Sequence, residues 1–226
     1  MLEVRNLHAY YGKSHILQGV DLDIAAGEVV SLLGRNGVGR STTVKAIMGE
    51  VPPQGTIRFK GQDIAGLPSH KIARLGLGYV PEHRDIFPSL TVRQNLILGI
   101  KDPRRPGKWR LQEMLDMFPN LARRADTPAG VLSGGEKQML ALASVLVIQP
   151  DTIIADEPTT LLDLRNRRRI VRELLALQQQ LIVVTHDLDM LRDFERVLVI
   201  DEGRLAYDGA PSEAISFYTD LMDAKP

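Results

Sequence analysis

Apolar and polar residues alternate at the start of the chain, in residues 2–4 and again in residues 20–24. A period of two is typical of a strand that buries one face and exposes the other. Residues 11–13 (Tyr-Gly-Lys) separate these segments and favour a turn. The pattern predicts an N-terminal antiparallel β part.

Further along, short apolar segments alternate with segments of helical spacing. The apolar segments are residues 28–33, 152–155 and 181–184, and helical spacing appears in residues 41–48, before Gly49, and in residues 167–178. Parallel strands need long crossover connections and helices on both faces of the sheet. Residues 197–203 add a predicted hairpin. The predicted fold class is α/β, with a mixed sheet core flanked by helices.

The middle of the chain, from about residue 82 to residue 130, is rich in proline and reads as loops and amphipathic helix. It predicts an inserted helical subdomain. We therefore expect a single domain over residues 1–226, with a core formed by residues 1–81 and 140–226 and a helical subdomain over residues 82–139.

Composition narrows the function classes. The chain has 226 residues, 28 Lys and Arg against 28 Asp and Glu, and no cysteine. Zero net charge argues against binding to nucleic acid, which needs an excess of basic residues. Without cysteine the chain has no disulfide and no thiolate metal site. The longest apolar run, residues 141–148, is far shorter than the roughly 20 residues of a membrane-spanning helix, so we expect no direct membrane insertion.

The strongest chemical motif is a glycine-rich segment that follows the apolar residues 28–33. It has the spacing of a phosphate-binding loop, except that Arg40 stands where lysine is usual. Glycines let backbone N–H groups turn toward a phosphate, and the next helix directs its positive end there. A tight turn without a ligand is the alternative. The candidate phosphate-binding residues are Gly34, Arg35, Asn36, Gly37, Val38, Gly39, Arg40, Ser41 and Thr42.

Two acids, Asp156 and Glu157, follow the apolar residues 152–155. A buried strand that ends in a carboxylate can hold Mg²⁺, for which Ser41 would supply a hydroxyl, and a neighbouring acid can polarise an attacking water. These acids therefore indicate phosphoryl transfer. The alternative is an exposed acidic turn.

A third motif, Leu-Ser-Gly-Gly-Glu, occupies residues 132–136. Ser133 and Glu136 have the spacing of a capping box, which predicts the start of a helix. Gly134 and Gly135 would let a phosphate come close to that helix end. Taken alone, the motif is equally consistent with an ordinary helix start.

Together the motifs resemble those of the ATP-binding subunit of an ABC transporter, over essentially the whole chain. In that family the LSGG signature, here residues 132–135, binds the γ-phosphate of ATP held by another subunit. The resemblance implies a P-loop NTPase fold of ABC type and a head-to-tail dimer with two ATP molecules. That dimer would be a homodimer or a heterodimer with a paralogous ATPase.

The remaining family motifs follow in order along the chain. Tyr11 matches the aromatic residue that stacks on adenine, and Asp163 matches the acid of the D-loop. Glu82 stands where the family usually has a Mg²⁺-sensing glutamine, and His186 matches the histidine that contacts the γ-phosphate. The resemblance thus implies catalytic roles for Glu157, His186 and Glu82, Mg²⁺ ligation by Ser41, Glu82 and Asp156, and ATP contacts from Tyr11, residues 34–42, Ser133, Gly134, Gly135 and Asp163.

Two parts of the chain resemble different subfamilies. Residues 1–136 resemble ATPases of branched-chain amino acid and urea-type importers, and residues 137–226 resemble those of biotin-type energy-coupling-factor importers. This predicts a hybrid chain joined near the signature, with ordinary drift in one family as the alternative. The resemblance implies import of a small nutrient, amino-acid-like or vitamin-like, through transmembrane permease subunits that dock on the helical subdomain. The chain would then lie peripherally at the cytoplasmic face of the plasma (inner) membrane.

Arg40 keeps a second hypothesis open. A guanidinium is larger than an ammonium and planar, so it can bind phosphate in a geometry that slows turnover. The chain would then be an ATP-binding regulatory or structural subunit that is deficient in hydrolysis. A soluble ABC ATPase of translation or DNA repair is a third hypothesis, against which the zero net charge and the single phosphate loop weigh.

Overall fold

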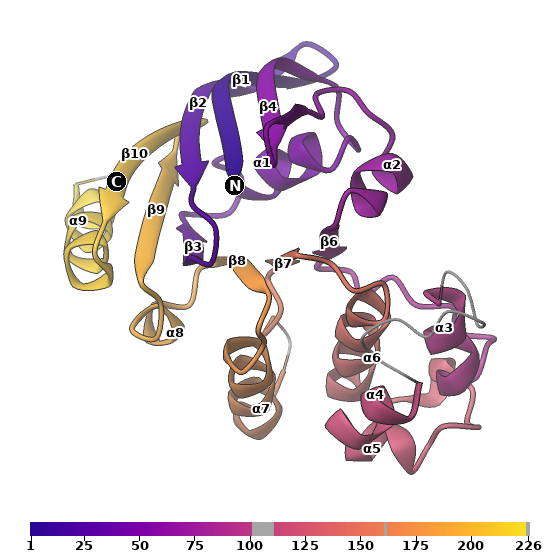
Figure 1. Ribbon diagram of the computed structural model, residues 1–226. Helices are drawn as coiled ribbons and strands as arrows, with labels where there is room; N and C mark the ends of the chain where they lie inside the picture. Colours follow the sequence, from indigo (N-terminus) through magenta and orange to yellow (C-terminus); the bar gives the residue numbers. More distant parts are fainter. Residues whose placement is uncertain (101–110, 161, 225–226) are drawn as a thin grey trace. The chain divides into compact units, whose positions relative to one another are not determined.

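The computed structural model describes residues 1–100, 111–160 and 162–224. Its chain forms two compact units, one of residues 1–75 and 179–226 and the other of residues 76–178 (Figure 1). The predicted helical subdomain, residues 82–139, falls within the second unit, and its residues 101–110 lie outside the described part.

An antiparallel sheet opens the first unit, as predicted. It contains β1 (Leu2–Tyr11), β2 (Ser14–Ile24), β4 (Pro53–Phe59) and β5 (Gln62–Asp63), in the order β2-β1-β4-β5. The turn between β1 and β2 falls at residues 12–13. The alternating apolar side chains Leu2 and Val4 are fully buried, so the period of two in the sequence marks the inner face of this sheet.

A second sheet in the same unit is mixed. It contains β3 (Val29–Leu33), β8 (Gln180–Thr185), β9 (Arg196–Asp201) and β10 (Arg204–Gly209). β3 lies between β8 and β9 and is parallel to both, and β10 is antiparallel to β9. The predicted α/β class and hairpin are confirmed.

The helices of the first unit are α1 (Arg40–Ile47), α2 (Ser69–Arg74), α8 (Leu188–Leu191) and α9 (Pro211–Asp223). Gly49 follows α1 with a φ of 71°, and its N–H donates to the carbonyl of Ala46. The N–H of Glu50 reaches back to Lys45, which completes a Schellman motif. Gly49 thus ends α1, as its position in the sequence predicts.

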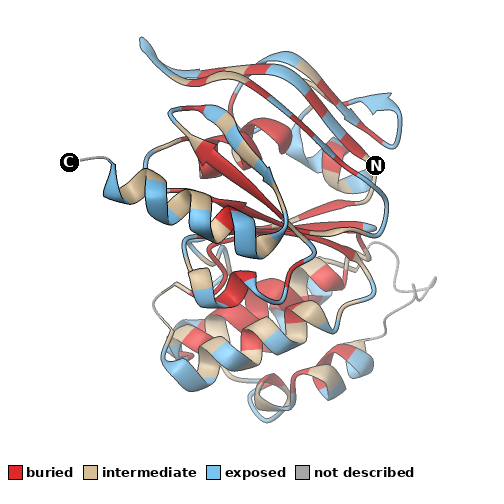
Figure 2. Ribbon diagram, turned by 90° about the vertical axis from the view of Figure 1, so that its left-hand side faces the viewer, coloured by how far each residue is buried: buried red, intermediate tan, exposed pale blue. Residues whose placement is uncertain are grey.

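The second unit pairs β6 (Leu77–Val80) in parallel with β7 (Thr152–Asp156). Its helices are α3 (Val92–Leu98), α4 (Leu111–Met117), α5 (Pro119–Ala122), the 3-10 turn η1 (Ala129–Val131), α6 (Gly134–Leu146) and α7 (Leu164–Leu175). α7 begins three residues earlier than the predicted 167–178, because Asp163 caps it. β3, β7, β8 and β9 are buried along most of their length, whereas β1 and β2, like the helices, mix buried and exposed positions (Figure 2).

In the described ranges, no helix combines the length and the apolar character that a bilayer crossing requires.

The β9–β10 hairpin turns through Glu202 and Gly203, both of positive φ (46° and 73°). Lys60 and Gly61 repeat this two-residue turn between β4 and β5, with φ of 53° and 77°. Positive φ at both central residues identifies type I′ turns. The surroundings differ: a Cβ on Gly203 would lie 2.1 Å from the carbonyl oxygen of Ile16, whereas a Cβ on Gly61 would meet no atom within 4 Å.

These twin turns predict unequal costs for one substitution. We expect Gly203→Ala to lower the free energy of unfolding by about 3 kcal/mol, because it adds a backbone clash to the strain of a positive φ. Gly61→Ala, the matched control, carries the strain alone and should cost about 1 kcal/mol. Urea denaturation measures both values, and equal losses would contradict the close approach at Gly203.

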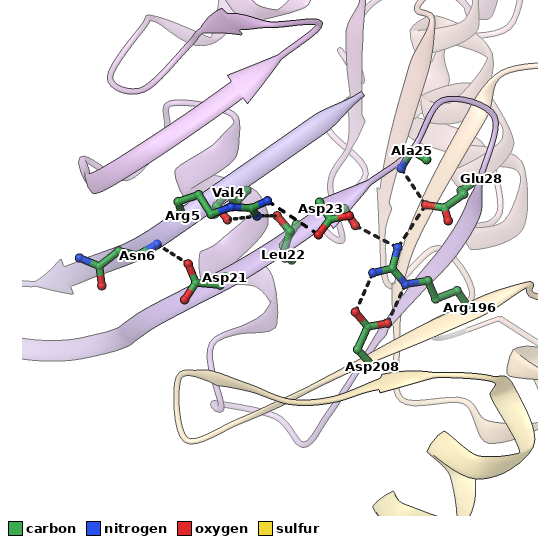
Figure 3. Close-up of polar contacts among 10 residues, drawn as sticks. All are labelled: Val4, Arg5, Asn6, Asp21, Leu22, Asp23, Ala25, Glu28, Arg196 and Asp208. Carbon is green, nitrogen blue, oxygen red and sulfur yellow. Dashed lines mark hydrogen bonds and ion pairs between the residues drawn. The ribbon is translucent and has the colours of Figure 1, made fainter.

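Arg196 joins several segments of the first unit (Figure 3). Its Nε and Nη2 donate to the two carboxylate oxygens of Asp208, each at 2.6 Å. Its Nη1 donates to Glu28 at 3.3 Å and to the backbone carbonyl of Asp23 at 3.0 Å. The hydrogen bonds from Arg196 to Asp208 raise the pKa of the guanidinium above its ordinary value, and Glu28 and Asp23 act in the same direction.

We expect Arg196→Lys to lower the free energy of unfolding by about 1 kcal/mol, since an ammonium cannot bond both oxygens of Asp208 and also reach Glu28. Arg58→Lys, an exposed site on β4, serves as the control and should change stability little. Urea titration in low salt gives the comparison. If Arg196→Lys lowers the free energy of unfolding no more than the control does, a single positive charge at this position is sufficient for stability.

Candidate functional site

The predicted site residues fall into two sets, one in each unit. The first unit holds Tyr11, residues 34–42 and His186. The second holds Glu82, residues 133–135, Asp156, Glu157 and Asp163.

The phosphate-binding loop leads directly from β3 into α1, which is the strand, loop and helix order that the motif predicts. Gly39 caps α1 with a φ of 112° and offers no side-chain acceptor to the first turn. The first N–H groups of a helix carry positive partial charge and bind anions readily. At Gly39 a Cβ would also lie 2.7 Å from Leu17 Cδ2. Glycine at this position therefore serves both the backbone turn and the packing.

Arg40 is the first residue of α1 and is only 5% exposed. Its Nη2 donates to Asn36 Oδ1 at 3.0 Å, so the guanidinium is held by the loop itself. Ser41 follows it and is half-buried, and Thr42 is buried. The loop thus combines a cationic side chain, a hydroxyl and a run of backbone N–H groups, which together suit a nucleotide phosphate.

A backbone contact from elsewhere in the unit supports this loop. The N–H of Gly203 donates to the carbonyl of Val38 at 2.9 Å, and the N–H of Gln18 donates to the carbonyl of Gly203 at 2.8 Å. The β9–β10 turn therefore bonds the loop on one side and β2 on the other. No motif in the sequence identifies Gly203 as part of this support.

Tyr11 and His186 both end strands of the first unit. Tyr11 is the last residue of β1 and is half exposed, and His186 follows β8 with an exposed side chain. Beside Tyr11, Tyr10 stacks on His15 with ring centroids 4.3 Å apart. The end of the β1–β2 hairpin therefore presents aromatic rings, which are suited to stacking on a planar base.

Asp156 and Glu157 lie at the end of β7, a strand buried along its whole length. Tyr79 on β6 donates from its hydroxyl to Asp156 Oδ2 at 3.4 Å. Glu157 is 5% exposed and has a φ of 48°, an uncommon conformation for a residue other than glycine. Thr160 donates to Glu157 Oε2 at 3.2 Å. Strained backbone of this kind persists where surrounding structure imposes it, and it concentrates at functional sites.

The LSGGE segment starts a helix, as predicted. The N–H of Glu136 donates to Ser133 Oγ at 3.3 Å, and the N–H of Ser133 donates to Glu136 Oε2 at 2.8 Å, so the capping box is complete. A Cβ on Gly135 would lie 2.7 Å from Asn166 Cγ of α7. Glycine at position 135 therefore allows α6 and α7 to approach each other.

Asn166 connects that approach to Asp163. Its backbone N–H donates to Asp163 Oδ1 at 2.9 Å and its amide Nδ2 to Oδ2 at 2.7 Å. These hydrogen bonds hold the pKa of the Asp163 carboxyl below its ordinary value. The signature glycines and the D-loop acid, distant in sequence, are thus brought together through one asparagine.

Glu82 lies in an exposed turn after β6. Two residues on, Arg84 has a φ of 55° and donates to the carbonyl of Thr160 and to Gln138. Sequence reasoning missed Tyr79, Arg84, Thr160 and Asn166. Of these, only Thr160 and Asn166 could have been suggested by the sequence, because each follows a predicted site acid, Glu157 or Asp163, by three residues.

The donor chemistry fits Mg²⁺. Ser41, Glu82 and Asp156 offer only oxygen atoms, the ligands that hard cations prefer. In the part of the chain that the structure describes, no group of three or more His, Cys, Asp or Glu side chains could hold a metal by itself. Mg²⁺ in phosphoryl transfer is usually bound by one or two carboxylates together with substrate phosphates and water.

Comparison with known proteins agrees with this chemistry. The family model described as ABC transporter matches residues 17–160. A protein of Deinococcus radiodurans described as an ABC transporter ATP-binding protein is 38% identical over 98% of this chain and 99% of its own length. The high-affinity branched-chain amino acid transport ATP-binding protein BraG of Pseudomonas aeruginosa is 38% identical over 70% of this chain and 69% of its own.

Among solved structures, a dimeric ATP-binding cassette in a post-hydrolysis state, bound to ADP and phosphate, is similar with a TM-score of 0.80 and 26% identity. The match covers 93% of this chain and 99% of that one. The predicted P-loop NTPase fold of ABC type is therefore confirmed. Since the family model covers more than half of the chain and a relative matches it almost from end to end, the chain belongs to the ABC transporter family, as an ATP-binding subunit with ATPase chemistry.

Proposed function

We propose that this subunit hydrolyses Mg-ATP to energise import of a small, amino-acid-like nutrient. The observation that carries the proposal is the buried Glu157 after β7, with its positive φ and its bond from Thr160. A carboxylate fixed beside a candidate Mg²⁺ ligand is placed to orient and polarise an attacking water. The likeness to BraG supports an amino-acid-like solute.

In this proposal the first unit binds the nucleotide. Tyr11 stacks on adenine, and the backbone N–H groups of residues 34–42 bind the phosphates together with Arg40. Ser41, Asp156 and Glu82 would hold Mg²⁺, which neutralises phosphate charge when bound. Glu157 accepts the proton of water, and His186 donates to the γ-phosphate. Each role rests on the chemistry of that side chain and on the family motif.

Catalysis would need two copies of the ATPase. Ser133, Gly134, Gly135 and Asp163 would complete the ATP site of a partner copy. The capping box supports this role, because it fixes the N-terminal end of α6. Gly134 and Gly135 carry no side chain there, which leaves room for a phosphate to approach. The partner would be a second copy or a paralogous ATPase.

The permease subunits would dock on the helical subdomain, which would place the chain at the cytoplasmic face of the inner membrane. Phe87 and Leu98 support this role, because each is 59% exposed. Asn95 accepts from the N–H of Phe87 and donates to the carbonyls of Phe87, Leu90 and Thr91. One side chain thus fixes the segment that carries Phe87 onto α3.

The origin of the two halves stays a prediction. The relative from Deinococcus radiodurans aligns over 98% of the chain and therefore spans the expected join near residue 136. A vitamin-like solute, which the second half suggests, would require the second half to determine which permease binds. The candidate docking side chains Phe87 and Leu98 belong to the first half.

A second function, nucleotide binding without turnover, is favoured by the bond between Arg40 and Asn36. An arginine committed to its own loop would stabilise transition-state charge less than a mobile lysine. The two functions predict different hydrolysis rates for one pair of variants.

We expect the purified native chain to hydrolyse Mg-ATP within about tenfold of the rate of Arg40→Lys, because guanidinium retains the charge at the phosphates. Glu157→Gln should lower kcat by at least about a hundredfold, since the amide cannot accept the proton. Steady-state phosphate release measures all three. Hydrolysis by Arg40→Lys alone would favour the binding-only function, and full activity of Glu157→Gln would remove the assigned base.

The composite site makes a separate prediction on assembly. Glu157→Gln with ATP should elute at the mass of a dimer in light scattering, because unhydrolysed γ-phosphate stays between the two copies. The double variant Glu157→Gln, Ser133→Arg should remain monomeric with ATP, since a bulky cation fills the signature end of the interface. A monomer in both cases would refute ATP-dependent pairing.

A further inference from the structure

Arg84 joins three segments of the second unit through its side chain. Its Nε donates to Gln138 Oε1 at 3.1 Å, and its Nη2 donates to the backbone carbonyl of Thr160 at 2.7 Å. A Cβ on Gly134 would lie 3.2 Å from its Nη1. One guanidinium therefore contacts the first two turns of α6 and the segment between β7 and α7.

Each contact lies next to a residue of the proposed site. Arg84 itself is two residues from Glu82. Gln138 lies one turn after the signature glycines, and Thr160 donates its hydroxyl to Glu157 while its carbonyl accepts from Arg84. Moving Arg84 would thus move the Glu157 segment and the signature helix together.

Gln138 depends on this contact for its orientation. It is 2% exposed, and in the described part of the chain its Nε2 has no hydrogen-bond partner. An unsatisfied buried amide is costly, and a flipped amide would turn its donor toward the donors of Arg84. Arg84 therefore selects one rotamer of a buried side chain in α6.

The backbone also indicates that the position of Arg84 is imposed. Its φ of 55° is uncommon for a residue with a side chain, and its N–H closes a turn onto the carbonyl of Pro81 at 3.2 Å. Strain of this kind costs free energy and persists only where other contacts maintain it. The bonds to Gln138 and Thr160 are such contacts.

We propose that Arg84 is a positioning residue for ATP hydrolysis, which couples the turn that carries Glu82 to the Glu157 segment and to the signature helix. The inference rests on the proposed function, because it gives that site a mechanical link. Residues 82–98 also carry the proposed permease surface, so a displacement of that surface would reach Glu157 and residues 133–135 through one side chain.

Lysine cannot replace arginine in this role. The two acceptors, Gln138 Oε1 and the Thr160 carbonyl, are met by different nitrogens of one rigid plane, whereas an ammonium presents a single nitrogen. Arg84→Lys keeps the charge and should lose the coupling. This separates positioning from simple electrostatic stabilisation.

The test is steady-state Mg-ATP hydrolysis by the full chain with Arg84→Lys, Gln138→Met and the double variant. We expect kcat to fall at least about fivefold in each, with KM for ATP changed less than about twofold, because the loop of residues 34–42 is untouched. The double variant should be no slower than the slower single variant, since both remove one interaction. Arg58→Lys, at an exposed site on β4 outside every proposed site, is the matched control and should keep the native kcat.

Native kcat in Arg84→Lys would overturn the inference while leaving the proposed function intact. A fall in kcat that is matched by an equal loss of folded protein in thermal melts would also overturn it, as would additive effects in the double variant. Absence of hydrolysis by the native chain would overturn the proposed function, and with it this inference.

Discussion

Close backbone packing around the phosphate-binding loop is the constraint on which the rest of the first unit depends. A Cβ on Gly34 would lie 2.3 Å from the carbonyl oxygen of Ile200, and Gly39 and Gly203 meet neighbours at similarly short distances. β2, β9 and the loop can approach this closely only because these positions lack side chains. The loop is therefore held by backbone from distant parts of the chain rather than by its own sequence alone.

The sequence predicts most of the fold, because burial imposes periods that can be read directly. β3, β7, β8 and β9 appear as apolar segments, whereas β4, β5 and β6 were not predicted. The helix starts at Arg40 and Gly134 follow a glycine loop and a capping box. The start of α7 was misplaced because the helix-forming pattern is weak before residue 167, whereas the cap at Asp163 acts through a side-chain bond to Asn166. A local hydrogen bond outweighed hydrophobic periodicity there.

The candidate site divides in the same way. The residues 34–42, Asp156, Glu157 and residues 133–135 belong to contiguous motifs whose spacing predicts them, whereas Tyr11, Glu82, Asp163 and His186 were assigned through the resemblance to the family. Their supports are different: Tyr79 reaches Asp156 from a neighbouring strand, and Gly203 reaches Val38 from the far end of the chain. Such contacts follow from the tertiary path, and nothing in the sequence around Tyr79 or Gly203 indicates them.

The hydrogen bonds of Asn95 have a consequence for the proposed docking of a permease subunit at Phe87. Binding usually costs free energy because loops and side chains lose conformational freedom in the complex. Here the backbone around Phe87 is already tied to α3 at four polar atoms before any partner arrives. Most of that ordering is completed when the chain folds, so contact with Phe87 can be both small in area and mechanically stiff.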